Sequence, residues 1–157
     1  MKCLIKSMLI ISIALSGCTK LDTPVYSNIE NSNFWSTPDQ VAAGIAPAYT
    51  QLQGLCIWDY QEMQGVTTDE IIIPTRGNDW YDNGGHQRMY LHTWTANDDM
   101  VNGVWSTIFG GIGKCNFILD VVNNLSEKPA DVDNINAQLK VLRAYYYLLA
   151  IDTYGNV

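Results

Sequence analysis

Apolar residues recur at helical spacing in two long segments in the second half of the chain. In residues 98–123 and 132–154 they return every three or four positions, which places them on one side of a helix. A short polar stretch that contains Pro129 separates the two segments. We therefore predict two long antiparallel helices joined by a short loop, because a short connection keeps consecutive helices side by side.

A third helix is predicted to begin at Thr37 and to end near Gly54. Thr37 can cap it, Pro38 suits the first helical position, and Gln40 completes a capping box. Pro47 lies inside this helix and should kink it or interrupt its hydrogen bonding. A shorter helical segment is expected over residues 57–65.

Three glycines stand close together inside the predicted helix of residues 98–123. Each of them, Gly110, Gly111 and Gly113, costs the helix about 1 kcal/mol relative to alanine. Glycines at this density suggest that another helix crosses very closely at that point.

The middle of the chain has a different pattern. Residues 66–73 end in a β-branched run, residues 75–85 are rich in glycine and asparagine, and residues 88–94 could be extended. We predict an all-α fold of helix pairs with an irregular loop region. Such pairs resemble tetratricopeptide units, although no 34-residue repeat is visible.

The N-terminus has the pattern of an export signal. Two lysines precede a nine-residue apolar stretch, residues 7–15, which is far shorter than the roughly 20 residues of a membrane-spanning helix. Leu15-Ser16-Gly17-Cys18 follows and resembles the bacterial lipobox. We predict a signal peptide over residues 1–17, a lipid on Cys18 and a polar tether over residues 18–33. The alternative is an ordinary signal peptide with an unmodified cysteine.

Charge and residue types exclude several classes of protein. The formal net charge of −7 argues against nucleic acid as a partner. No Cys-x-x-Cys pair is present, and His86 and His92 lack a metal-ligand partner at helical spacing, so neither a metal nor a cofactor is expected. Cys56 and Cys115 are either free thiols or a disulfide. Asp69 and Glu70 are adjacent and point apart, which argues against the paired acids of a glycosidase.

Taken in order, the motifs of the chain resemble the N-terminal part of the SusD/RagB family of outer-membrane lipoproteins. The motifs are Cys18, Leu21-Asp22, Phe34-Trp35, Ala48-Tyr49, Thr68-Asp69-Glu70, His92-Thr93-Trp94-Thr95, Trp105, Cys115-Asn116, Arg143-Ala144-Tyr145 and Tyr154-Gly155. The resemblance implies a non-catalytic, surface-exposed protein of the cell outer membrane. It would capture oligosaccharides and pass them to a SusC-type TonB-dependent transporter. Because family members are several times longer, residues 34–157 are expected to be part of a larger, truncated domain.

The glycine-rich loop supplies the candidate ligand site. It contains Trp80, Tyr81, Asn83, Asp79 and Arg76, which combine aromatic faces with amide, carboxylate and guanidinium groups that bond sugar hydroxyls. The resemblance adds that a tryptophan and an asparagine three positions later contact glucan in starch-binding members. Trp80 and Asn83 have that spacing. The other aromatic residues, Trp94, Trp105 and Tyr145 to Tyr147, are expected in the core.

Three other functions stay open from the sequence. The chain could be a peptide-binding member like RagB, a helical-repeat lipoprotein that only organises partner proteins, or a surface glycosidase. The identity of the ligand, and whether residues 18–157 fold alone, are not determined by the sequence.

Overall fold

The described part of the chain is a set of helices without a β-strand. A computed structural model describes residues 34–57 and 59–157, so the predicted signal peptide, Cys18 and tether lie outside the described residues. Its elements are α2 (Pro38–Ile57), α3 (Asp59–Val66), the 3-10 helix η1 (Asp82–Gly84), α4 (Gly85–Tyr90), α5 (Asp99–Asn124) and α6 (Val132–Tyr154). The all-α prediction is confirmed, and α5 and α6 match the two long predicted segments closely.

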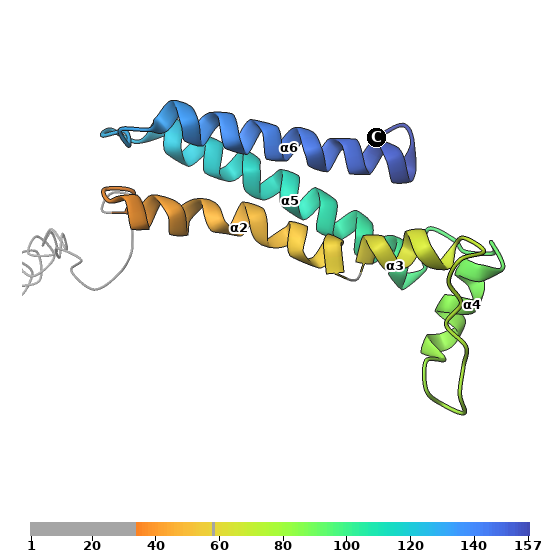
Figure 1. Cartoon of the computed structure of the whole chain (residues 1–157). Coiled ribbons are helices and arrows are strands. Elements are labelled where there is room, and N and C mark those ends of the chain that lie inside the picture. The colour runs from red at the N-terminus through yellow and green to blue at the C-terminus, as the bar shows by residue number, and fades with distance from the viewer. Residues whose placement is uncertain (1–33, 58) are drawn as a thin grey trace, which may run out of the picture.

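Helices α2, α5 and α6 form a three-helix bundle. Figure 1 shows α6 running antiparallel to α5, and α2 lying along the opposite side of α5. α3 continues from α2 toward the start of α5. Residues 67–98, which we call the arm, contain α4 and extend away from the bundle (Figure 1). None of the described helices is long and apolar enough to cross a membrane.

The predicted capping box is present at the start of α2. The Gln40 backbone N–H donates to Thr37 Oγ1 at 3.3 Å, and the Thr37 N–H donates to Gln40 Oε1 at 3.0 Å. α2 continues through Pro47 to Ile57, with the Thr50 hydroxyl donating to the Pro47 carbonyl at 2.9 Å. The helix therefore continues beyond Pro47, although proline has no N–H to donate to a helical hydrogen bond.

Replacing Thr37 with alanine should lower the free energy of unfolding by about 1 kcal/mol, because the Gln40 N–H loses its acceptor. The measurement is the shift of the urea unfolding midpoint. Thr37→Ser keeps the hydroxyl and should stay near the native value, whereas an equal loss in both variants would contradict the capping role.

Tyr146 of α6 explains the close approach of the helices. Its ring packs on Gly111 of α5, and its hydroxyl donates to the Ala48 carbonyl of α2 at 2.6 Å. Burial raises the pKa of Tyr146 to about 12, so the hydroxyl keeps its proton for this bond. The predicted close crossing is confirmed at Gly111. It does not extend to Gly113, where an added Cβ would meet nothing within 4 Å.

One expectation for the middle of the chain is wrong. Residues 88–94 are not extended, because α4 continues to Tyr90 and the Leu91 N–H still donates to the Gln87 carbonyl at 2.9 Å. Fully buried Met89 anchors this helix.

The core prediction for the aromatic residues holds for Tyr146 alone. Trp94 and Trp105 are each 41% exposed, and Tyr145 and Tyr147 are exposed to a similar extent. A helix in this bundle buries one stripe of side chains, and three consecutive tyrosines cannot all face it. Instead, Trp105 packs against Phe109 in a tilted arrangement and against Tyr154 edge to face, with ring centroids 4.2 and 5.0 Å away.

Candidate functional site

The glycine-rich loop of the arm has an unusual backbone. Arg76 and Asp79 exchange two backbone hydrogen bonds of 3.1 and 3.0 Å across a tight turn. Directly after it, Trp80, Asp82 and Asn83 have φ values of 59°, 42° and 51°, in the left-handed region. Residues other than glycine adopt this backbone region at a cost of about 1–3 kcal/mol each, and such strain clusters at functional sites. The loop thereby holds the Trp80 ring 53% exposed to solvent.

A polar hollow of about 380 Å³ lies beside Trp80, within the size range of small-molecule sites. Residues from five segments line it, which brings together parts of the chain that are far apart in the sequence. The lining residues are Glu62 of α3, Trp80, Asp82 of η1, Gly85, His86 and Arg88 of α4, and Asp98, Asp99 and Met100 at the start of α5.

His86 is a buried residue among those that line this polar hollow. Its side chain is buried, with Nε2 lying 3.1 Å from an Asp82 carboxylate oxygen and Nδ1 lying 3.5 Å from Glu62. Nδ1 makes no hydrogen bond, and the imidazole lies 6.2 Å from the Trp80 ring, centroid to centroid. His86 thus joins α3 to the loop and places two carboxylates next to an exposed aromatic ring.

Arg88 joins α4 to two other segments that border the hollow, the start of α5 and η1. Its Nε donates to Asp98 Oδ1 at 2.5 Å, a second nitrogen pairs with the same carboxylate, and Nη1 donates to the Asn83 carbonyl at 2.7 Å. The Thr95 N–H also donates to Asp98, at 2.7 Å. The hydrogen bond from Arg88, followed by that from Thr95, holds the pKa of Asp98 below its usual value.

This lowered pKa predicts a pH-dependent loss of stability. A carboxyl group whose pKa is lower in the folded than in the unfolded chain stabilises the fold above the unfolded pKa of about 3.9. That contribution is lost as the pH falls through the folded pKa. We expect Asp98→Asn to lower the urea midpoint at pH 7 and to differ less from the native chain near pH 3. A difference that stays constant with pH would contradict the Arg88–Asp98 assignment.

Only part of the predicted site reaches the hollow. Trp80 lines it, whereas Arg76, Asp79, Tyr81 and Asn83 are exposed outside it. The contribution of Asn83 is its backbone carbonyl, which binds Arg88. Sequence reasoning missed the ionisable side chains that line the hollow, Glu62, Asp82, His86, Arg88, Asp98 and Asp99. Among these, Asp82 and His86 are four residues apart, a helical spacing that the sequence analysis overlooked when it found no ligand partner for His86.

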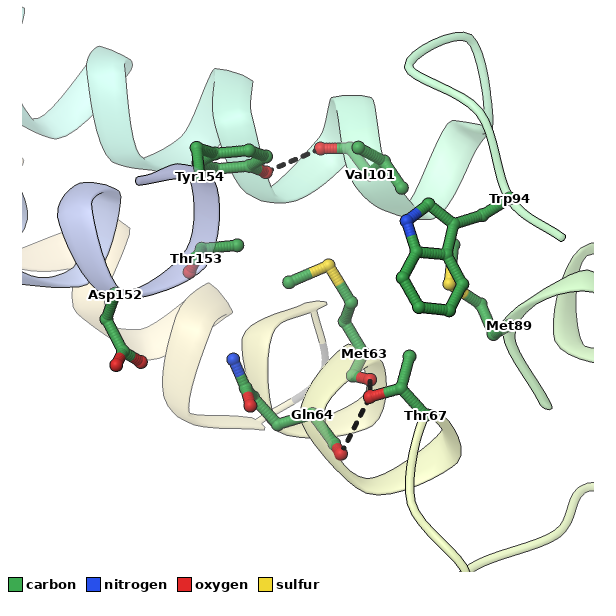
Figure 2. A pocket seen from close by; sticks show the side chains of 9 residues that line it. All are labelled: Met63, Gln64, Thr67, Met89, Trp94, Val101, Asp152, Thr153 and Tyr154. Atoms are coloured by element: carbon green, nitrogen blue, oxygen red, sulfur yellow. Dashed lines mark hydrogen bonds between the residues drawn. The ribbon is translucent and has the colours of Figure 1, made fainter. Parts of the chain in front are cut away.

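A second, smaller cavity lies where α3, α5 and α6 meet the arm. Figure 2 shows Met63, Met89 and Trp94 around its apolar part, with Asp152 and Gln64 at the opposite edge. The Tyr154 hydroxyl donates to the Val101 carbonyl at 2.7 Å and closes one wall (Figure 2). Its volume of about 170 Å³ is below the range of ordinary ligand sites.

Three residues considered in the sequence analysis, His92, Cys56 and Cys115, do not line either of these cavities. His92 Nε2 lies 2.9 Å from the Thr67 carbonyl, and its ring packs on Trp94. His92 therefore joins the later part of the arm to the residue at which the arm begins. Cys56 is an exposed free thiol and Cys115 a buried one. In the part of the chain that the structure describes, no group of three histidine, cysteine or acidic side chains could hold a metal ion.

A helical frame that presents an exposed tryptophan beside a polar hollow is typical of a binding protein. A family model described as starch-binding and associating with the outer membrane matches residues 21–157. The chain therefore belongs to the SusD-like family, whose members are described as binding proteins of the outer membrane. Comparisons with curated proteins and with solved structures give no significant match.

Proposed function

We propose that this protein captures glycans at the cell surface and delivers them to a TonB-dependent transporter of the SusC type. A lipid on Cys18 tethers it to the outer membrane, residues 18–33 serve as the spacer, and residues 34–157 face the exterior. The protein binds its ligand without catalysis. Trp80 provides the stacking surface for a sugar ring, and the hollow beside it provides acceptors for hydroxyl groups.

One observation carries this proposal. Within a chain that matches the starch-binding family, a stretch of backbone with three residues in the left-handed region presents a half-exposed tryptophan beside a polar hollow. Aromatic rings and hydrogen-bonding side chains in this combination suit a sugar, which has both an apolar ring face and hydroxyl groups. Arg76, Asp79, Tyr81 and Asn83 surround Trp80 and could contact the sugar units on either side.

Affinity electrophoresis of the full chain through gels that contain different polysaccharides tests the capture of glycans. We expect retardation in at least one neutral glucan gel relative to a gel without polysaccharide. Migration unaffected by every polysaccharide would overturn the proposal, and release of reducing sugar would point to a glycosidase instead. Delivery is tested separately by co-purification, which should yield a large outer-membrane barrel protein.

The lipid anchor predicts a clear effect of Cys18→Ser. The native chain should fractionate with outer membranes and incorporate labelled palmitate, and the variant should do neither. Cys56→Ser is the matched control, since Cys56 is an exposed thiol within the described residues. Membrane association of the Cys18→Ser variant equal to that of the native chain would exclude the anchor.

A scaffold function is the second candidate, and the outer face of α6 favours it. Val141, Leu148 and Ile151 are all more than half exposed there, and Val141 lines an apolar groove between α2 and α6. Exposed apolar surface of this kind is typical of protein contacts. Replacing Val141 and Leu148 with serine should leave glycan retardation unchanged if Trp80 provides the ligand site, and should weaken partner binding if the scaffold function applies.

A further inference from the structure

His86 is a buried ionisable side chain that lies between two carboxylates from different parts of the fold. Glu62 of α3 faces its Nδ1 at 3.5 Å, and Asp82 of η1 faces its Nε2 at 3.1 Å. Only 7% of the His86 side chain is exposed to solvent. The imidazole therefore stands at the junction between α3 and the arm.

An uncharged imidazole cannot bind both of these carboxylates. It carries one N–H, so one ring nitrogen donates a hydrogen bond and the other presents a lone pair. The contact between Nε2 and Asp82 has the length of a hydrogen bond, whereas Nδ1 is buried and has no hydrogen-bond partner. With the proton on Nε2, the lone pair of Nδ1 faces the negatively charged oxygen of Glu62.

The carboxylate of Glu62 has the complementary deficiency. Its side chain is only 22% exposed, and among the described residues His86 is the one side chain that forms an ion pair with it. A largely buried carboxylate without a hydrogen bond is costly. A second proton on the imidazole, at Nδ1, supplies the missing donor, and each ring nitrogen then binds one carboxylate.

The other ionisable groups around the ring do not bind it. Arg88, Asp98 and Asp99 line the same polar hollow, and Arg88 is paired with Asp98 rather than with the imidazole. Tyr90 lines a neighbouring apolar pocket that His86 also borders. The two carboxylates that flank the ring are therefore the groups that respond directly to a proton on His86.

We propose that His86 is a proton-operated latch between α3 and the arm. In a mildly acidic medium Nδ1 takes a proton from solvent, and the imidazolium donates to Glu62 and Asp82 together. As the pH rises the proton returns to solvent, and the bond to Glu62 is lost. Asp82 follows Trp80 by two residues, so the latch determines how firmly the exposed tryptophan is held. The latch belongs to the arm itself and does not depend on which ligand the protein binds.

Amide hydrogen exchange of the full chain in detergent, followed by mass spectrometry, tests the latch. Histidine exchanges its proton between about pH 5 and pH 8. After correction for intrinsic exchange rates, we expect residues 80–90 to be about tenfold better protected at the lower pH, because a hydrogen bond to a charged group shifts a local opening equilibrium by this order. Nitrogen NMR of the His86 ring should show one protonated nitrogen at the higher pH and two at the lower.

Matched variants assign the effect to the contact between His86 and Glu62. Glu62→Gln removes the charge beside the ring and should abolish most of the difference in protection. Glu70→Gln makes the same change at an exposed residue of the arm outside the hollow and should preserve the difference. The chain has two histidines, and His92→Asn should also preserve it.

Each other outcome decides against the latch. A difference in protection that persists in Glu62→Gln, or that disappears in His92→Asn, overturns it. A His86 ring that keeps one proton throughout this pH range overturns it as well. A loss of helical circular dichroism over the same range would make the change a global unfolding and exclude a local latch. None of these outcomes bears on glycan capture, which affinity electrophoresis tests separately.

Discussion

Replacing Gly111 with alanine is expected to destabilise the three-helix bundle by about 2 kcal/mol, although alanine is the better helix former. The added Cβ would lie 2.4, 2.6 and 2.7 Å from three carbons of the Tyr146 ring. That ring is fully buried, and its hydroxyl is held by the Ala48 carbonyl, so it cannot move aside without breaking a buried hydrogen bond. Overpacking of this kind costs about 1–3 kcal/mol or more, which exceeds the gain of about 1 kcal/mol in helix propensity.

Gly113→Ala provides the control in the same helix. An alanine Cβ at this exposed position meets nothing within 4 Å, so only the propensity gain should remain. We expect urea unfolding followed by circular dichroism to show a lower midpoint for Gly111→Ala and a slightly higher one for Gly113→Ala. Equal stabilisation by both substitutions would show that α5 and α6 are further apart than in this structure.

A double-mutant cycle would assign the penalty to the ring itself. Tyr146→Leu removes the aromatic atoms that the new Cβ would meet. In that background Gly111→Ala should cost much less than in the native chain, because the two residues are in direct contact.

Replacing Trp80 with alanine should weaken glycan binding at least about tenfold, or by about 1.4 kcal/mol of binding free energy. Large aromatic side chains often contribute much of the binding energy of a site, and Trp80 is the tryptophan that lines the polar hollow. In affinity electrophoresis the variant should migrate as it does without polysaccharide. Trp80→Phe should keep part of the retardation, since a smaller aromatic face remains.

Phe117→Ala tests whether the loss is local. Phe117 is an exposed aromatic residue on α5, outside the polar hollow, and its removal should leave the retardation unchanged. Retardation of Trp80→Ala equal to that of the native chain would remove this loop from the ligand site. Similar thermal unfolding of the variant and the native chain would confirm that the substitution leaves the fold intact.

The helices could be predicted from the sequence because their signals are local. The capping box of Thr37 and Gln40, the stop at Gly155 after α6, and the spacing of apolar residues in α5 all act within a few residues of each other. The close crossing at Gly111 was predicted from the density of glycines in this helix, although the sequence did not show which of them makes the contact.

The site could be predicted only where it depends on one segment. Trp80 was found because the loop sequence itself marks it, whereas Glu62 and Asp98 are separated from it by about one to two dozen residues and meet it only after folding. The exposed position of Trp105, which lies in α5, was missed for a related reason. Helical spacing shows which residues share a face of a helix. How many of these faces are covered by other helices depends on the tertiary structure.

The arm returns to its own starting point. His92 lies 2.9 Å from the carbonyl of Thr67, so residues 68–91 form a closed excursion from the bundle. Lengthening a flexible excursion of this kind costs little, about 0.6 kcal/mol for each doubling. The exposed residues of this excursion can therefore change in number and kind without redesign of the helices beneath, provided that Met89 and the Arg88–Asp98 pair, which join it to the bundle, are kept.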